Sequence, residues 1–151
     1  MNTYKGDFLR ISLSKNEDGR IRSKERKLMN LVSIEGEIID LTMVEKEDER
    51  LTFICFNECY SMGFSSENHD VIDHFMVHNG ECFTAIESAI LDEDQIILFY
   101  GTQSGNILIR ENWSEEPHVV QIEGEISYLK LAHSLTFLVA VTTSNQIHIL
   151  R

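Results

Sequence analysis

Short apolar runs separated by polar turns recur along this chain at a fixed interval. Gly-Glu pairs stand at positions 36–37, 80–81 and 124–125, so that successive pairs are 44 residues apart. Each pair precedes an apolar-rich run, and a second, almost wholly apolar run follows after a short polar turn. Runs of this length predict β-strands, and the second run of each set predicts a strand buried on both faces. The first runs lie at 38–44, 82–90 and 126–132, and the second runs at 51–56, 95–100 and 135–141.

Weaker runs complete the pattern. They predict third strands at 64–66, 106–110 and 146–151, and outer strands at 71–77 and 118–122. Residues 6–11 resemble residues 105–110, which predicts that the chain opens at a third strand. An outer strand at 27–33 then follows an insertion at 16–26. The pattern therefore predicts 13 strands, and the last set lacks its outer strand.

A period of about 44 residues with four strands in each period is typical of a β-propeller blade. We therefore predict an all-β fold, a partial propeller of about three four-stranded antiparallel blades in a single domain, 1–151. The predicted parts are a half-blade with a basic loop at 1–37, blades at 38–81 and 82–125, and an incomplete blade at 126–151. Propellers close with four to eight blades, so about three blades leave an open arc with unpaired edges. The chain is therefore expected to be a fragment or short form of a longer propeller, or to be completed by a second copy or a partner. The alternative is a small β-barrel or sandwich.

Two segments resemble a known family. The string YGTQSGNILI at 100–109 resembles the second strand, turn and third strand of WD-repeat propellers, and His78-Asn79-Gly80 resembles the segment that opens their blades. The chain has Arg110-Glu111 where the family usually ends its third strand with Trp-Asp, and Ser104 stands for the family's turn aspartate. The resemblance implies a protein-protein interaction scaffold, or a subunit of a multiprotein complex, without enzymatic activity or cofactor.

Charge divides the chain into a basic arm and an acidic body. Residues 1–27 hold 8 of the 13 Lys and Arg and 4 of the 25 Asp and Glu, and the chain carries a net charge of −12. The acidic body disfavours nucleic acid and anionic lipid, so we expect other proteins as partners, including a second copy or a partner chain that completes the propeller. No apolar run approaches a membrane span or a secretory signal, and the 3 cysteines cannot all pair. These features predict a cytoplasmic or nuclear protein that does not contact the membrane.

Three groups of residues are candidates for partner binding. Glutamates that begin the inner strands are expected to gather at one rim of the channel, where they form an acidic docking surface or remain solvated. The single tryptophan is a candidate interface anchor, although packing on a neighbouring strand is an equal alternative. The basic cluster suits an acidic partner or nuclear import, or forms a solvated loop. The residues are Glu37, Glu81 and Glu125; Trp113; and Arg20, Arg22, Lys24, Arg26 and Lys27.

One cluster suggests metal chemistry. In a strand, Asp70, His74 and His78 share a face next to His69, and such a set can hold a divalent cation. The alternative is an edge strand whose charged side chains face water. Cys55 and Cys59 lie within or beside an apolar strand, where packing is expected instead of zinc binding. Nucleophile, Walker and zinc-protease motifs are absent, so we predict no enzyme. The alternatives are a metal-dependent propeller enzyme that uses the cluster at 69–78, or a ligand-carrying β-barrel.

Overall fold

The structure is a computed structural model of the chain. It describes residues 7–15, 17–30, 36–46, 49–57, 59–65, 67, 70–77, 80–91 and 95–151. The chain divides into two compact units, residues 1–36 and 37–151, and each is described by itself. No helix in these ranges is long and apolar enough to cross a bilayer.

The first unit contains a long antiparallel hairpin. Strand β1 (Asp7–Lys15) pairs with β2 (Ile21–Asn30), with a register shift at Phe8/Leu9, and Gly19 at φ 76° lies in the connecting turn. The predicted loop at 16–26 is therefore wrong over most of its length, because Lys15 pairs with Ile21 and the ladder continues to Asn30. A two-stranded ribbon does not need an apolar face along its whole length, so its second strand lacks the apolar signal on which the prediction rested. The role of this hairpin as a half-blade stays a prediction.

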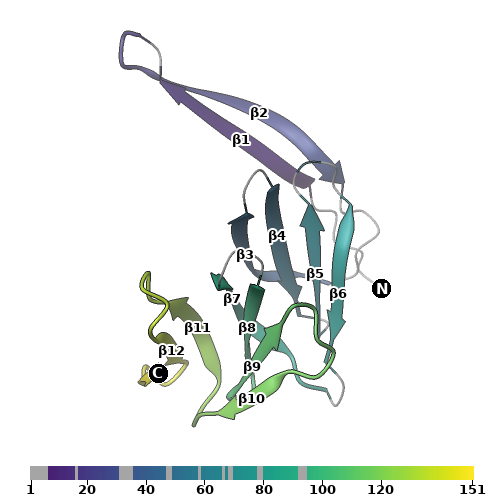
Figure 1. Cartoon of the computed structure of the whole chain (residues 1–151), viewed down its shortest axis with the longest axis vertical. Helices are drawn as coiled ribbons and strands as arrows, with labels where there is room; N and C mark the ends of the chain where they lie inside the picture. Colours follow the sequence, from purple (N-terminus) through teal and green to yellow (C-terminus); the bar gives the residue numbers. More distant parts are fainter. Residues whose placement is uncertain are drawn as a thin grey trace. The chain divides into compact units, whose positions relative to one another are not determined.

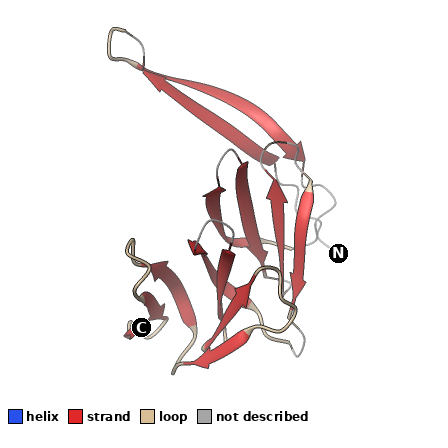
Figure 2. Ribbon diagram, viewed as in Figure 1, coloured by secondary structure: helices blue, strands red, loops and turns tan. Residues whose placement is uncertain are grey.

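The second unit contains three antiparallel sheets of four, four and three strands, and each sheet follows the chain order as a meander (Figure 1; Figure 2). No helix occurs in the described part of this unit. The inner strands β3, β7 and β11 contact one another in succession, which is the arrangement of propeller blades and not of a barrel or sandwich. The all-β partial propeller is thus confirmed. The strands are β3 (Ile38–Lys46), β4 (Glu49–Phe56), β5 (Tyr60–Ser65), β6 (Val71–Met76), β7 (Phe83–Leu91), β8 (Gln95–Thr102), β9 (Asn106–Glu111), β10 (His118–Gln121), β11 (Ile126–Leu131), β12 (Leu138–Thr142) and β13 (Ile147–Leu150).

Two predicted strand boundaries are wrong for local reasons. Strand β12 begins at Leu138 and not at residue 135, because Leu135 adopts φ 56° and donates its N–H to the Ala132 carbonyl in a turn. Strand β5 begins at Tyr60 and not at residue 64. Its buried face carries Ser61 and Gly63, so it lacks the apolar signal of a core strand.

Two apolar cores hold the three sheets together. Between the first and second sheets, Phe75, Phe83 and Tyr100 form a ring cluster in which Phe83 and Tyr100 stack at 4.7 Å between centroids. Between the second and third sheets, Ala85 and Ile107 pack with Ile126, Leu129 and other side chains of β11 and β12. The strands β4 and β8 are buried on both faces over most of their length, as their continuous apolar runs predict.

Candidate functional site

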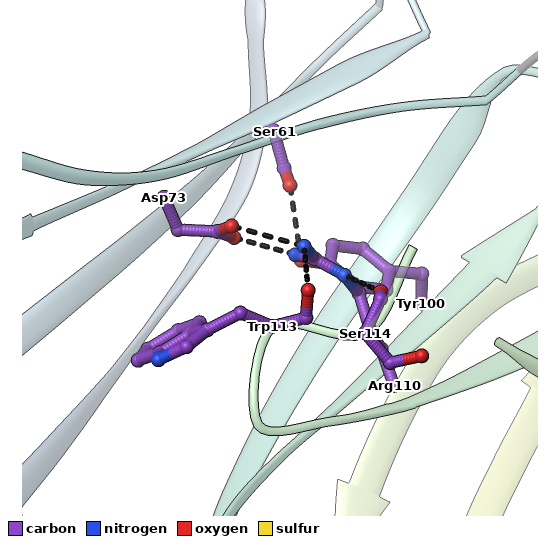
Figure 3. Close-up of polar contacts among 6 residues, drawn as sticks. All are labelled: Ser61, Asp73, Tyr100, Arg110, Trp113 and Ser114. Atoms are coloured by element: carbon purple, nitrogen blue, oxygen red, sulfur yellow. Dashed lines mark hydrogen bonds and ion pairs between the residues drawn. The ribbon is translucent and has the colours of Figure 1, made fainter. Parts of the chain in front are cut away.

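A buried ion pair joins the first sheet to the second. Arg110 ends the apolar part of β9, and strand alternation places it on the same face as Leu108, towards the first sheet. Its guanidinium donates to Asp73 of β6 through Nη1 (2.5 Å to Oδ2) and Nη2 (3.0 Å to Oδ1), in the bidentate geometry that favours Arg (Figure 3). The side chains of Arg110 and Asp73 are only 3% and 5% exposed.

The Arg110 guanidinium makes further contacts through its N–H groups and through its face. Arg110 Nε donates to the Ser114 carbonyl at 2.6 Å, Nη2 donates to the Trp113 carbonyl at 3.1 Å, and the guanidinium lies 4.3 Å above the Phe75 ring. Burial acts to lower the pKa of Arg110, but the hydrogen bonds and charge of Asp73 outweigh it and raise that pKa. The guanidinium is therefore a buried, multiply bonded structural group that joins the two sheets.

Tyr100 belongs to the same junction. Its hydroxyl accepts a hydrogen bond from Ser61 Oγ at 3.0 Å. Burial raises the pKa of Tyr100 to about 12, against the lowering effect of the Ser61 bond and of the Arg110 charge. The phenol thus remains protonated and serves the junction as a neutral hydrogen-bonding group.

Carboxylates of the inner strands accept backbone N–H groups from the next sheet. Asp40 of β3 accepts from the Ile86 N–H at 3.0 Å. Glu87 of β7 accepts from the Leu131 N–H at 3.3 Å and pairs with Lys130 Nζ at 2.7 Å. Burial acts to raise the pKa of Glu87, but the hydrogen bonds from Lys130 and from the Ser88 and Leu131 backbone N–H groups outweigh it and lower that pKa. These contacts set the spacing of neighbouring inner strands.

The three predicted rim glutamates lie one or two residues before β3, β7 and β11, but their surroundings differ. Glu37 is exposed and Glu125 is half-buried. The Glu81 carboxylate accepts from Ser104 Oγ at 2.7 Å and from Asn106 Nδ2 at 2.5 Å, so it ties the β8–β9 turn to the start of the blade. Their role in partner binding stays a prediction.

The other predicted partner-binding residues lie in two places. Trp113 packs its ring on Phe53 with 5.6 Å between centroids and remains 38% exposed. Arg20 is exposed in the β1–β2 turn. The basic residues at 22, 24, 26 and 27 lie on β2, and their side chains are outside the described part. The partner-binding roles of the basic cluster and of Trp113 stay predictions.

The predicted metal cluster is described only in part. His69 and His78 lie outside the described residues, and His74 is exposed beside the Tyr60 ring at 5.8 Å. Within the described residues, no group of three or more His, Cys, Asp or Glu side chains could hold a metal ion. Cys55 is fully buried in the apolar core, which agrees with the packing role predicted for it.

The third sheet has an open edge. Among the described residues, β13 pairs only with β12. The Thr142 N–H donates to the Gln146 carbonyl, and the register that follows alternates hydrogen-bonded with non-bonded pairs along β13. Ile147 and Ile149 fall on the non-bonded pairs, so their backbone N–H and C=O groups point to the open edge. Their side chains are also 68% and 63% exposed.

An apolar groove of about 470 Å³ lies next to this edge, between the second and third sheets. The second sheet contributes Phe99, Ile107, Ile109 and Val120, while the third contributes Leu131, Leu138 and Leu150. A strand added to β13 would extend the third sheet and could place alternate side chains in this groove. The edge of the last sheet therefore combines outward-pointing backbone groups with an adjoining apolar groove.

Comparisons with known proteins support the fold. No protein-family model and no curated protein matches the chain. Among solved structures, the WD40 β-propeller domain of Doa1 is similar at TM-score 0.64 and 14% identity, over 92% of this chain and 46% of that one. A chain of the Chaetomium thermophilum Polycomb Repressive Complex 2 bound to GSK126 is similar at TM-score 0.64 and 15% identity, over 76% and 28%. BBS1N in complex with ARL6DN gives TM-score 0.60 and 15% identity, over 86% and 47%.

This chain therefore spans between about a quarter and a half of the solved chains that it resembles. The shared fold agrees with the interpretation of YGTQSGNILI, which now occupies the end of β8, the turn and most of β9. Ser104 lies in that turn and bonds to Thr102 and Glu81 through its hydroxyl. The fold of the chain is that of a partial β-propeller, and it is similar to the WD40 β-propeller domain of Doa1.

Proposed function

We propose that this chain is a non-enzymatic protein-interaction scaffold or a subunit of a multiprotein complex, which docks partners through blade edges and loops. The observation that carries the proposal is the third sheet, where the free backbone groups of Ile147 and Ile149 adjoin an apolar groove. Edge strands of this kind accept an extended strand from another chain. The partner strand is either a segment of another protein or a second copy of this chain.

Charge favours a basic partner. Residues 28–151 carry 5 Lys and Arg against 21 Asp and Glu. Three of these cations already pair with carboxylates within the sheets: Arg50 with Glu45, Arg110 with Asp73, and Lys130 with Glu87. The excess of carboxylates attracts a basic protein segment and repels a phosphate backbone. A strand with alternating apolar residues and flanking Lys or Arg suits both the groove and this charge.

The test uses a substitution that blocks only the edge. Ile149→Pro removes an N–H that points away from β12, so the β12–β13 pairing is retained while a new strand loses a donor and meets the proline ring. Ile149→Val is the matched control, because it keeps the N–H and a β-branched side chain. The native mass of the purified full chain is measured by light scattering over a dilution series, and stoichiometric co-purifying proteins are identified by mass spectrometry.

If the proposal holds, the wild type and Ile149→Val form a dimer or retain the same stoichiometric partner. Ile149→Pro is then monomeric and loses that partner, although its circular dichroism spectrum is unchanged. A self-associating wild type identifies the second copy as the occupant, and a retained heterologous chain identifies a separate partner. Equal assembly of Ile149→Pro and wild type, or a wild type that binds no chain at all, would contradict the proposed docking edge.

A further inference from the structure

Two cysteines from different sheets meet at the first junction. Cys59 lies in the turn between β4 and β5, and Cys82 directly precedes β7. Their Sγ atoms are 3.2 Å apart, although the residues are 23 positions apart in sequence. Neither cysteine is in a disulfide, and both are half-buried. A disulfide has an S–S distance of about 2.05 Å, so the sulfurs need to approach by only about 1 Å more.

The backbone around each sulfur is held in place. The Cys59 carbonyl accepts from the Val77 N–H at 3.0 Å, which ties the turn to the end of β6. The Cys82 carbonyl accepts from the Gln103 N–H at 3.1 Å, which ties it to the β8–β9 turn. Cys59 also adopts φ 68°, a left-handed conformation that non-glycine residues rarely occupy. Backbone outliers of this kind persist where the surrounding structure enforces them, and here the outlier places a thiol beside a second thiol.

The third cysteine provides an internal contrast. Cys55 is only four residues from Cys59, but it is fully buried on the strand β4. Burial, with a smaller effect of the Asp40 charge, raises the pKa of Cys55 to about 12. Because the thiolate is the reactive form of cysteine, Cys55 is inert at neutral pH. Any oxidation of the chain is therefore expected to discriminate between Cys55 and the pair at the junction.

We propose that Cys59 and Cys82 form a reversible disulfide that links the first blade to the second. With a peroxide as oxidant, one thiolate attacks a peroxide oxygen, the O–O bond breaks, and a sulfenic acid and one water form. The second thiolate attacks the sulfenic sulfur, the S–O bond breaks and a second water leaves. The two thiols thus lose two electrons and two protons, and the peroxide is reduced to two waters. A dithiol reductant reverses the reaction by exchange.

The test maps the bond directly in the full chain. The purified protein is treated with hydrogen peroxide, denatured, alkylated at its remaining thiols and digested without reduction. Trypsin is unsuitable because residues 51–109 contain no Lys or Arg, so all three cysteines stay in one peptide. A glutamyl endopeptidase cleaves after Glu49, Glu58, Glu67, Glu81 and Glu87, and places Cys55, Cys59 and Cys82 in separate peptides.

The expected result is a linked pair of peptides 59–67 and 82–87, with peptide 50–58 alkylated at Cys55. Dithiothreitol should restore alkylation at all three positions. Three free thiols after peroxide treatment, a bond that includes Cys55, or a linked pair found only in a covalent dimer would overturn the proposal.

Variants separate the linkage from general oxidation. Cys82→Ser should lose the linked peptides and Cys55→Ala should keep them, with Cys59→Ser as a second loss-of-bond variant if Cys82→Ser does not fold. A bond that closes a loop of this size should raise the melting temperature by roughly 5–10 °C on oxidation in the wild type and in Cys55→Ala. The same treatment should not raise it in Cys82→Ser. Equal melting temperatures for oxidised and reduced wild type would overturn the proposed link between the blades.

Discussion

Substitution of Asp73 by Asn tests whether the buried ion pair holds the first two sheets together. The change keeps the shape of the side chain and removes its charge, while Arg110 remains almost fully buried. One amide oxygen can still accept from the guanidinium, and the bonds to the Trp113 and Ser114 carbonyls remain. Breaking a buried pair from one side costs about 3–5 kcal/mol, and the retained acceptors place Asp73→Asn near the lower figure. For a chain of this size, about 3 kcal/mol corresponds to a loss of about 6–12 °C in melting temperature.

Urea unfolding followed by circular dichroism measures this free energy of unfolding, and a double-mutant cycle isolates the pair. Asp73→Asn and Arg110→Met should each be strongly destabilising, and the double variant should lose less than the sum because no uncompensated charge remains buried. Glu123→Gln, an exposed carboxylate, serves as the control and should change stability by less than about 0.5 kcal/mol. If Asp73→Asn lowers the free energy of unfolding by less than about 1 kcal/mol, or if the losses in the cycle are additive, this ion pair does not hold the two sheets together.

Predictions for four further variants concern other contacts of the second unit. The folded pKa of Glu87 is lowered from its usual 4.5, so its stabilisation is complete above that pH and is lost as the pH falls through the lowered folded value. Urea midpoints between about pH 3 and 6 should therefore show a shallower acid dependence in Lys130→Met than in the wild type. Gly63→Ala should lose about 1–3 kcal/mol in the same assay, because the new Cβ would lie 2.7 Å from Phe53 Cε1. In Gly80→Ala the new Cβ has no atom within 4 Å, so the stability should fall only by the cost of the positive φ, about 1 kcal/mol. Trp113→Ala should lose less stability than Asp73→Asn, because the indole is 38% exposed, and an equal or larger loss would contradict its peripheral packing on Phe53.

The repeat could be predicted from sequence because each sheet repeats the same local sequence features. A Gly with positive φ at 36, 80 and 124 precedes each inner strand, and a central strand buried on both faces appears as a continuous apolar run. Signals of this kind are local, so one sequence is sufficient to detect them. The start of β5 was mispredicted for the same reason, because its buried face carries Ser61 and Gly63 in place of apolar residues.

The contacts between sheets could not be predicted in the same way. Arg110 follows the apolar run at 107–109 and Asp73 lies within the apolar-rich strand β6, but the two residues are 37 positions apart and belong to different sheets. Their pairing depends on the rotation of one blade against the next, which the strand pattern does not specify. The contacts of Glu81 could not be predicted either. Its carboxylate accepts hydrogen bonds from Ser104 and Asn106 of its own blade, although the sequence suggests only a carboxylate at the rim. The sequence predicts the strands and the open edge, but only the packing shows which charged side chains pair or hydrogen-bond within the fold.

The two junctions between sheets differ in chemistry, and this difference favours the third sheet as the place for a partner. The first junction combines a bidentate ion pair, the Ser61–Tyr100 bond and two sulfurs in contact, all of which require one relative placement of the sheets. The second junction has polar contacts at its inner strands, through Glu87, while its outer part is an apolar groove. Apolar contacts are not directional, so an incoming strand can fill the groove without breaking a specific polar bond. Docking at the edge of β13 therefore adds burial at small cost, whereas opening the first junction would leave Arg110 and Asp73 without partners.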